Sequence, residues 1–332
     1  MVFSRAAMVA MSATIYLAIG PKVYAQTPHA EEQTLKIAMA SNSFAFGGLR
    51  IAEHAGLFQK NGINPVLTVM ENANASISAL LSGSVDLAIS APDDVLFAAA
   101  KGQPIAIVLN LFRGLNGSLI VSKSLANRSG VLADASLDEK LRALNGATIA
   151  VPSPTSVLIP IKAPVEAAGG SLTFTYMGQP LMAAALQNGA VDAIMAGSPY
   201  WEAAVSSGDA TLWLNGPAGE FPEEVTPNSV TVMSTLSSYA AENPETIQRI
   251  RDVFADLHDL VRNNPEKAIS ALKEAYPNSD HNIIEDVFEQ YSTNWTQPEY
   301  QLSDVERHID LMLRIRQSDD LLKIDPKAVI VP

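Results

Sequence analysis

ALLSGSVD, residues 79–86, returns in closely similar form as ALQNGAVD at residues 185–192. Each copy predicts a helix that ends at a glycine and an apolar strand that begins at Val-Asp. A second echo lies upstream of each copy, where IAMAS at 37–41 is matched by IAVPS at 149–153. The sequence therefore predicts one α/β layout used twice. Two similar lobes have a cleft between them, and such clefts bind small molecules.

Apolar runs alternate with helical stretches across the first repeat. This alternation indicates parallel strands covered by helices. The expected strands are 35–39, 66–70, 86–90 and 105–111, and the expected helices are 48–59, 73–81 and 92–100. The run Arg113-Gly114-Leu115-Asn116-Gly117 then breaks the pattern and predicts a crossing into a second lobe.

The second repeat predicts the same alternation, followed by a return to the first lobe at Asn215-Gly216-Pro217. Its expected strands are 118–122, 147–151, 172–176, 192–195 and 212–214, and its expected helices are 137–144, 156–168, 181–187 and 199–206. After a strand at 229–233 the chain predicts helices that begin near Asn243, at Asn264 and at a capping box from Ser303 to Glu306. Lobe one is thus expected over 34–115 and 216–332, and lobe two over 116–215.

The N-terminus has the pattern of a secretory signal. Arg5 precedes an apolar run over 6–19, and Val23-Tyr24-Ala25 has the small residues of a cleavage site. The alternative is an anchor helix, but this run is shorter than the roughly 20 residues that a membrane span needs. We therefore expect cleavage after Ala25 and release into the periplasm.

The composition limits the possible partners. There is no cysteine, so the protein has no disulfide and no lipid-modified cysteine as an anchor. Loss of residues 1–25 removes only Arg5 and Lys22 among charged residues, which takes the net charge from −13 to −15. An acidic protein of this kind is not expected to bind nucleic acid or an anionic membrane surface.

Catalytic signals are weak. The chain has no nucleophile-elbow, P-loop, zinc-protease or dinucleotide motif, and its five histidines are not paired at metal-ligand spacing. Ser270-Ala271-Leu272-Lys273 matches a serine-nucleophile pattern but lies on the solvated face of an expected helix. We expect no catalytic residue, no metal and no cofactor.

Polar residues at the carboxyl ends of the expected strands are the candidate ligand contacts, because parallel sheets bind ligands at that edge. Any single Ser, Asn or Asp among them could instead be only a helix cap. Tyr200 and Trp201 are adjacent on one helix, so we expect at most one of them to face the cleft. The candidates are Ser41, Asn42, Phe44, Asp93, Ser153, Thr155, Ser156, Tyr200 and Trp201.

Four segments together resemble the substrate-binding proteins of ABC importers of the nitrate, sulfonate, taurine and thiamine-precursor type. Residues 51–63 look like the family's A-x-x-x-G-L-F-x-x-x-G-I segment, and 79–89 look like its AL-x-x-G-x-V-D segment. Residues 98–102 and 192–201 resemble two further family elements, and the likeness extends over most of 35–275.

The resemblance implies a two-lobed periplasmic-binding-protein fold of type II, with two mostly parallel sheets and two hinge crossings. It implies a monomer that binds a small molecule and delivers it to the permease and ATPase of an ABC importer. Sulfonates, aromatic acids and thiamine-precursor-like molecules are the expected ligands. No Lys or Arg stands in the ligand loops, whereas Asp93 and Asp94 do, which disfavours nitrate.

Two other functions are considered. One is a thiamine-pyrimidine-synthase-like enzyme of the same fold, but those enzymes carry a cysteine-rich motif and act inside the cell. The other is the ligand-binding subunit of a periplasmic sensor, which gene neighbourhood would distinguish from a transport protein.

Overall fold

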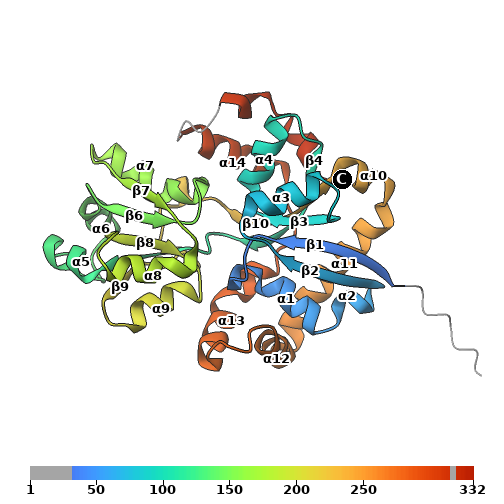
Figure 1. The fold of residues 1–332 in the computed structure, drawn as a ribbon, viewed down its shortest axis with the longest axis horizontal. Coiled ribbons are helices and arrows are strands. Elements are labelled where there is room, and N and C mark those ends of the chain that lie inside the picture. Colours follow the sequence, from blue (N-terminus) through green and yellow to red (C-terminus); the bar gives the residue numbers. More distant parts are fainter. Residues whose placement is uncertain (1–31, 315–318) are drawn as a thin grey trace, which may run out of the picture. The chain divides into compact units, whose positions relative to one another are not determined.

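Two five-stranded sheets, each flanked by helices, form the framework of the described residues, 32–314 and 319–332 of the computed structural model (Figure 1). The predicted signal peptide, residues 1–25, and the cleavage site after Ala25 lie outside the described residues. Within the described ranges, no helix is both long and apolar enough to cross a bilayer.

The first sheet consists of β1 (Gln33–Met39), β2 (Ile63–Val69), β3 (Leu87–Ser90), β4 (Ile105–Arg113) and β10 (Ser229–Leu236). Its strand order is β2-β1-β3-β10-β4. β1 is parallel to β2 and β3, and β10 is antiparallel to β3 and β4. Four strands therefore share one direction, and the strand from late in the chain opposes them.

The second sheet consists of β5 (Ser118–Ser122), β6 (Thr148–Val151), β7 (Thr173–Tyr176), β8 (Ala193–Ala196) and β9 (Ala210–Leu214). Its order, β7-β6-β8-β5-β9, repeats the plan of the first sheet, with β5 as its antiparallel strand. The predicted α/β class, with two mostly parallel sheets flanked by helices, is confirmed.

The first sheet and the helices that pack on it are called the first half, and the second sheet with α5–α9 is called the second half. The helices of the first half are α1 (Gly47–His54), α2 (Leu57–Lys60), α3 (Ala73–Leu81), α4 (Pro92–Ala100), α10 (Ser237–Glu242), α11 (Pro244–Asn263), α12 (Pro265–Ala275), α13 (His281–Trp295) and α14 (Leu302–Arg314). Those of the second half are α5 (Lys123–Ser129), α6 (Leu137–Ala143), α7 (Ile159–Ala167), α8 (Gln179–Gln187) and α9 (Tyr200–Ser206). Single 3-10 turns are η1 (Phe44–Phe46), η2 (Ser156–Leu158), η3 (Glu223–Val225), η4 (Asp319–Lys323) and η5 (Pro326–Val329).

The chain passes between the sheets twice, from β4 to β5 and from β9 to β10 (Figure 1). The two connecting segments touch at a pair of glycines. A Cβ atom on Gly216 would lie only 2.0 Å from the backbone oxygen of Gly117, so a side chain is excluded there. Gly216, one of the glycines that mark the crossings in the sequence, is therefore required for the close approach of the two segments.

Aromatic residues of the late helices anchor the loop after β1. Trp295 of α13 lies against Gly47 and Gly48, where an added Cβ would come within 2.3 and 2.8 Å of its side chain. The indole Nε1 of Trp295 also donates a hydrogen bond of 3.0 Å to the backbone oxygen of Phe44. The C-terminal helices thus fix the position of a loop that is distant in sequence.

Two predicted helices of the first and second halves differ from the observed ones. The helix expected over 48–59 is divided into α1 and α2, because Gly56 adopts the left-handed conformation, with φ of 75°, and ends the first segment. The helix expected over 156–168 begins as the 3-10 turn η2 and becomes α-helical only at Ile159.

Helix α5 was not expected. Its start is signalled by Ser122, whose hydroxyl accepts a hydrogen bond from the N–H of Leu125, and its end by the left-handed Gly130. The strand 118–122 masks this start, because Ser122 is both its last residue and the cap of the helix.

The predicted start of the last long helix is wrong by two residues. Ser303 lies inside α14, which begins at Leu302, and Asp304 accepts the capping hydrogen bond from the N–H of Gln301 at 2.8 Å. Asn264 caps α12 as expected, through the N–H of Lys267. The amide of Asn243 precedes α11 but donates back to the oxygen of Tyr239 instead of capping.

Candidate ligand site at the strand ends

The first predicted ligand loop follows β1. Ser41 is half-buried and Asn42 is exposed, so both are accessible at the carboxyl edge of the first sheet. Phe44 is completely buried, with its ring centroid 4.4 Å from that of Tyr276. The structure therefore makes Phe44 an anchor of the loop, and only Ser41 and Asn42 present side chains at its surface.

The corresponding loop of the second half follows β6. Ser153 is half-buried, whereas Thr155 and Ser156 are buried, with exposures of 4% and 2%. The N–H of Thr155 donates to the oxygen of Ser153 at 3.0 Å, which shapes the turn into η2. Ser153 is thus the most accessible of the three predicted contacts.

Segments at the strand ends of the two halves are in direct contact with each other. The N–H of Phe44 donates a hydrogen bond of 3.0 Å to the backbone oxygen of Ser198, which follows β8. The N–H of Ser156 donates a short hydrogen bond to the Oδ2 atom of Asp93, in the first turn of α4. Residues predicted independently from the two repeats therefore meet at one interface.

Asp93 is held on its other side by a histidine. His308 of α14 lies with its Nδ1 atom 3.1 Å from Asp93 Oδ1, and neither side chain is exposed. No sequence signal indicates this pair, because the two residues are 215 positions apart. The side chain of Asp93 therefore has polar partners in both halves, His308 in the first and Ser156 in the second.

Asp94, next to it, has an altered acidity. Burial is the largest cause that raises the pKa of Asp94 to about 7, and the neighbouring Asp93 carboxylate adds to the rise. A hydrogen bond of 3.1 Å from the N–H of Ala91 opposes this effect. Near neutral pH this carboxyl group is therefore partly protonated and can donate as well as accept a hydrogen bond.

The loop after β8 carries the remaining predicted contacts. Tyr200 and Trp201 are both half-buried at the start of α9. The hydroxyl of Ser198 donates a short hydrogen bond to Glu202, whose pKa is raised by burial in spite of that bond. Glu202 was not predicted, although a carboxylate in the first turn of a helix at this edge is a visible sequence signal.

The C-terminal helices contribute residues that the sequence did not identify. The hydroxyl of Tyr276, directly after α12, donates a hydrogen bond of 3.0 Å to the oxygen of Ser43. Burial raises the pKa of Tyr276 far above its usual value, and the nearby Tyr200 contributes to this rise. Tyr276 therefore lies close to one of the predicted aromatic contacts of the second half.

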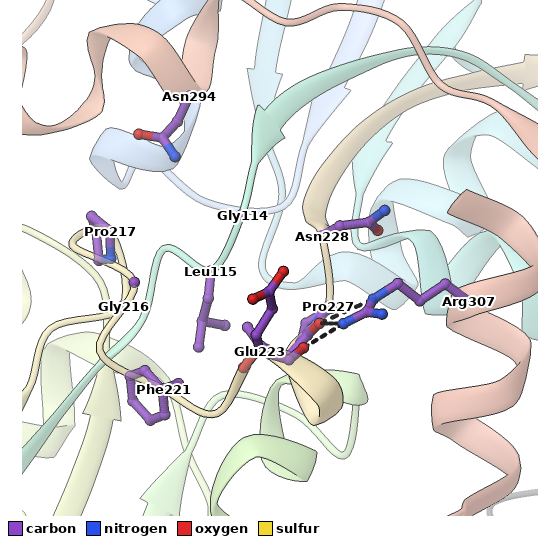
Figure 2. Close-up of a pocket in the computed structure, with 12 residues that line it drawn as sticks. Gly114, Leu115, Gly216, Pro217, Phe221, Glu223, Pro227, Asn228, Asn294 and Arg307 are labelled. Carbon is purple, nitrogen blue, oxygen red and sulfur yellow. Dashed lines mark hydrogen bonds between the residues drawn. The ribbon is translucent and has the colours of Figure 1, made fainter. Parts of the chain in front are cut away.

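A cavity of about 610 Å³ lies at the two crossings between the sheets. Figure 2 shows Leu115 and Phe221 on one side of it and Arg307 on the other. The Nη2 atom of Arg307 donates to the backbone oxygens of Glu223 and Thr226, at 2.7 Å for Thr226, so this guanidinium holds the returning segment. The cavity was not predicted from the sequence.

No group of three or more metal-ligating side chains lies together among the described residues. Asp93 bonds across the halves, Asp94 follows it in the first turn of α4, and Glu202 lies in the first turn of α9, whereas the predicted ligand loops contain no Lys or Arg. The arrangement is suited to polar recognition of a small molecule through hydroxyl, amide and carboxyl groups.

Known structures share this architecture. The aliphatic sulphonate binding protein SsuA of Escherichia coli matches with a TM-score of 0.68 at 19% identity, over 90% of this chain and 97% of that chain. The alkanesulfonate-binding protein SsuA of Xanthomonas axonopodis pv. citri, bound to MOPS, matches with a TM-score of 0.65 at 20% identity, over 91% and 97%. The nitrate-binding protein NrtA of Synechocystis PCC 6803 matches with a TM-score of 0.61 at 13% identity, over 90% and 87%. No curated protein matches the sequence.

The two sheets, their common strand order and the double crossing define a protein with the periplasmic-binding-protein fold. Residues 43–268, more than half of the chain, match the family model described as NMT1/THI5 like. The chain belongs to this family, as the resemblance in its sequence predicted.

Proposed function

We propose that this protein is the periplasmic solute-binding component of an ABC importer for a small organic solute. The observation that carries the proposal is the meeting of strand-end loops from both sheets, through Asp93 with Ser156 and Phe44 with Ser198. A solute held between these loops would be contacted from two sides and enclosed, which is how two-lobed binding proteins retain their ligands. The protein is proposed to bind its solute without chemical change and to act as a monomer.

The chemistry of the interface limits the solute. Sulfonates, aromatic acids and thiamine-precursor-like molecules are the candidates, in keeping with the family and its sulfonate-binding structural neighbours. The carboxyl group of Glu202, at the start of α9, and the absence of Lys and Arg from the predicted ligand loops favour a solute that donates hydrogen bonds over a simple inorganic anion. Half-buried Tyr200 and Trp201 are suited to stack on an aromatic ring.

The movement that admits the solute is proposed to occur at the crossings. Residues 34–115 and 216–332 would move as lobe one and residues 116–215 as lobe two, with hinges at 110–116 and 214–218. Closure about two such segments changes few backbone dihedral angles and keeps both sheets intact. Ser41, Asn42, Ser153, Thr155, Tyr200 and Trp201 would then approach the solute from opposite sides.

The proposed location is the periplasm, after removal of the signal peptide. N-terminal sequencing of protein from a periplasmic extract should give a chain that starts at Gln26. Recovery of intact protein with Met1 from the membrane fraction would contradict both the cleavage and the location.

A thermal-shift panel tests the binding function. The panel contains alkanesulfonates, aromatic carboxylates, aminopyrimidines and flavins, with nitrate as the simple anion. A solute present at about 100 times its dissociation constant should stabilise the fold by roughly 2.7 kcal/mol, which raises Tm by several degrees. The proposal predicts such a rise for an organic solute and none for nitrate. A rise for none of the organic classes would contradict it.

A further inference from the structure

We infer that Asp93 acts as a latch, linking the two halves through its hydrogen bond with Ser156. We infer also that His308 is a positioning residue, which orients the Asp93 carboxylate for this bond. The inference rests on the two-lobed binding function proposed above, but its test requires no ligand. It concerns how the closed arrangement is held together rather than which solute is bound.

The first argument is that the two oxygens of the Asp93 carboxylate have partners in different halves. Its Oδ1 atom faces His308 of α14 in the first half, at 3.1 Å from Nδ1. Its Oδ2 atom accepts a short hydrogen bond from the backbone N–H of Ser156 in the second half. One carboxylate thereby joins the first turn of α4 to the loop after β6.

The second argument is burial. Asp93 and His308 are both 0% exposed, and Ser156 is 2% exposed. A carboxylate removed from water is costly unless charge-assisted hydrogen bonds replace its hydration. His308 supplies one of these bonds in either state of the lobes, and Ser156 supplies the other only when the halves are together. Separation of the halves would exchange the Ser156 bond for water.

The third argument is the state of His308. Among the described residues, its Nε2 atom has no hydrogen-bond partner although it is buried. A proton on Nε2 would therefore lack an acceptor, whereas a proton on Nδ1 is shared with Asp93. A ring that donates from Nδ1 directs Oδ1 of Asp93 toward α14 and leaves Oδ2 aimed at Ser156.

The neighbouring carboxylate provides a matched contrast. Asp94 lies in the same helical turn, but its side chain accepts from the N–H of Ala91 within its own half. Asp94 directly follows Asp93 in the sequence, but its side chain bonds within the first half, whereas that of Asp93 also bonds to the second half. A substitution at Asp94 thus changes the charge of the same turn without removing a bond between the halves.

The test measures the separation of the halves by double electron–electron resonance. The chain has no cysteine, so the double variant Val69→Cys, Leu181→Cys can be spin-labelled at two sites only. Val69 and Leu181 are 53% and 64% exposed and lie near the carboxyl edges of the first and second sheets, so the pair spans the interface. Removal of one charge-assisted hydrogen bond should lower the ratio of closed to open molecules roughly tenfold or more.

In this labelled background, Asp93→Ala should move the distance distribution toward longer values. Asp93→Asn keeps the side-chain volume and should lengthen the distances in the same way but less. This variant replaces Asp93→Ala in the test if the alanine variant folds poorly. His308→Leu should also lengthen the distances, and His308→Asn, which keeps a donor near Nδ1, should restore them. Asp94→Asn should leave the distribution unchanged.

The latch is contradicted if folded Asp93→Ala and Asp93→Asn proteins have the distance distribution of the parent. It is also contradicted if Asp94→Asn opens the halves as much as Asp93→Asn. The role of His308 is contradicted if His308→Asn opens the halves as far as His308→Leu. Because no ligand is used, these results are independent of the thermal-shift panel, and either proposal can fail without the other.

Discussion

Asp86 and Asp192 make the same contact in the two sheets. Each carboxylate accepts a hydrogen bond of 2.8 Å from a backbone N–H of the adjacent parallel strand, that of Lys36 in β1 for Asp86 and that of Thr148 in β6 for Asp192. Each aspartate in turn donates its own N–H to the oxygen of the same partner, at 2.9 and 2.8 Å. The repeated Val-Asp of the sequence is therefore a structural clamp that ties the third parallel strand to the first.

Loss of either clamp should destabilise the protein. Asp86→Ala and Asp192→Ala each leave a backbone N–H without its carboxylate partner, so each should lower the free energy of unfolding by about 1–2 kcal/mol. Asp192 also forms an ion pair of 2.7 Å with the half-exposed Arg128, which adds little. Urea denaturation measures the difference. The matched Asp86→Asn and Asp192→Asn variants keep a hydrogen-bond acceptor and should recover most of the lost free energy of unfolding. Alanine variants as stable as the parent would refute the clamp.

The crossing glycines should differ sharply in their tolerance of alanine. At Gly216 a Cβ atom would meet the backbone oxygens of Gly117 and Leu115 at 2.0 and 2.8 Å, and backbone atoms cannot move aside cheaply. At Gly117 the nearest atom is the flexible side-chain end of Met195, at 3.3 Å. Gly216→Ala should therefore cost about 2 kcal/mol or more of unfolding free energy, and Gly117→Ala less than half of that.

The same urea denaturation experiment compares the two variants. Equal effects of Gly216→Ala and Gly117→Ala would show that the close approach of the two crossings does not limit the side chains allowed there.

Asp94 should make the stability of the protein depend on pH. Its pKa in the folded protein is about 7, above the value of 3.8 expected when it is unfolded, so the folded state holds the proton more tightly. The stabilisation from this proton is present below about pH 4 and is lost as the pH rises toward and through 7. Each pKa unit corresponds to about 1.4 kcal/mol, so the loss amounts to a few kcal/mol.

Asp94→Asn mimics the protonated carboxyl and removes this dependence. The variant should gain stability relative to the parent between pH 4 and pH 8, measured by urea denaturation at each pH. A difference that is constant over this range would mean that the folded and unfolded pKa values of Asp94 are the same.

The two accessible serines of the ligand loops should matter for binding. Ser41→Ala and Ser153→Ala should each weaken the binding of a solute identified by the thermal-shift panel by about 1 kcal/mol, or roughly fivefold, through the loss of one hydrogen bond. Isothermal titration calorimetry measures the dissociation constants. Ser303→Ala, at an exposed position of α14, is the control and should have no effect. Parental affinity in the Ser41→Ala, Ser153→Ala double variant would place the site elsewhere.

Local signals account for the elements that were predicted exactly. The bounds of α3, α4 and β5 coincide with the expected 73–81, 92–100 and 118–122. Asn72 caps α3 by accepting from the N–H of Ala75, and Asp94 accepts from Ala91 at the start of α4, so both helix starts are encoded within four residues. The use of one α/β layout in both sheets also followed from the internal repeat.

The contacts that complete the candidate site depend on distant packing. His308 reaches Asp93, and Trp295 reaches Phe44, only because α13 and α14 return to the first half after more than 200 residues. No local pattern distinguishes such a histidine or tryptophan from an ordinary core residue. The burial of Phe44 has the same origin, since it arises from Tyr276 and Trp295 rather than from its own loop.

Recovery of a bound solute tests the central claim most directly. The protein is saturated with a solute identified by the panel, incubated for many hours, denatured, and analysed by quantitative mass spectrometry. A binding component of an importer should return one equivalent of solute per chain with its mass unchanged and its amount complete. A product of different mass that accumulates with time, or the absence of any stoichiometric solute, would contradict the proposed function.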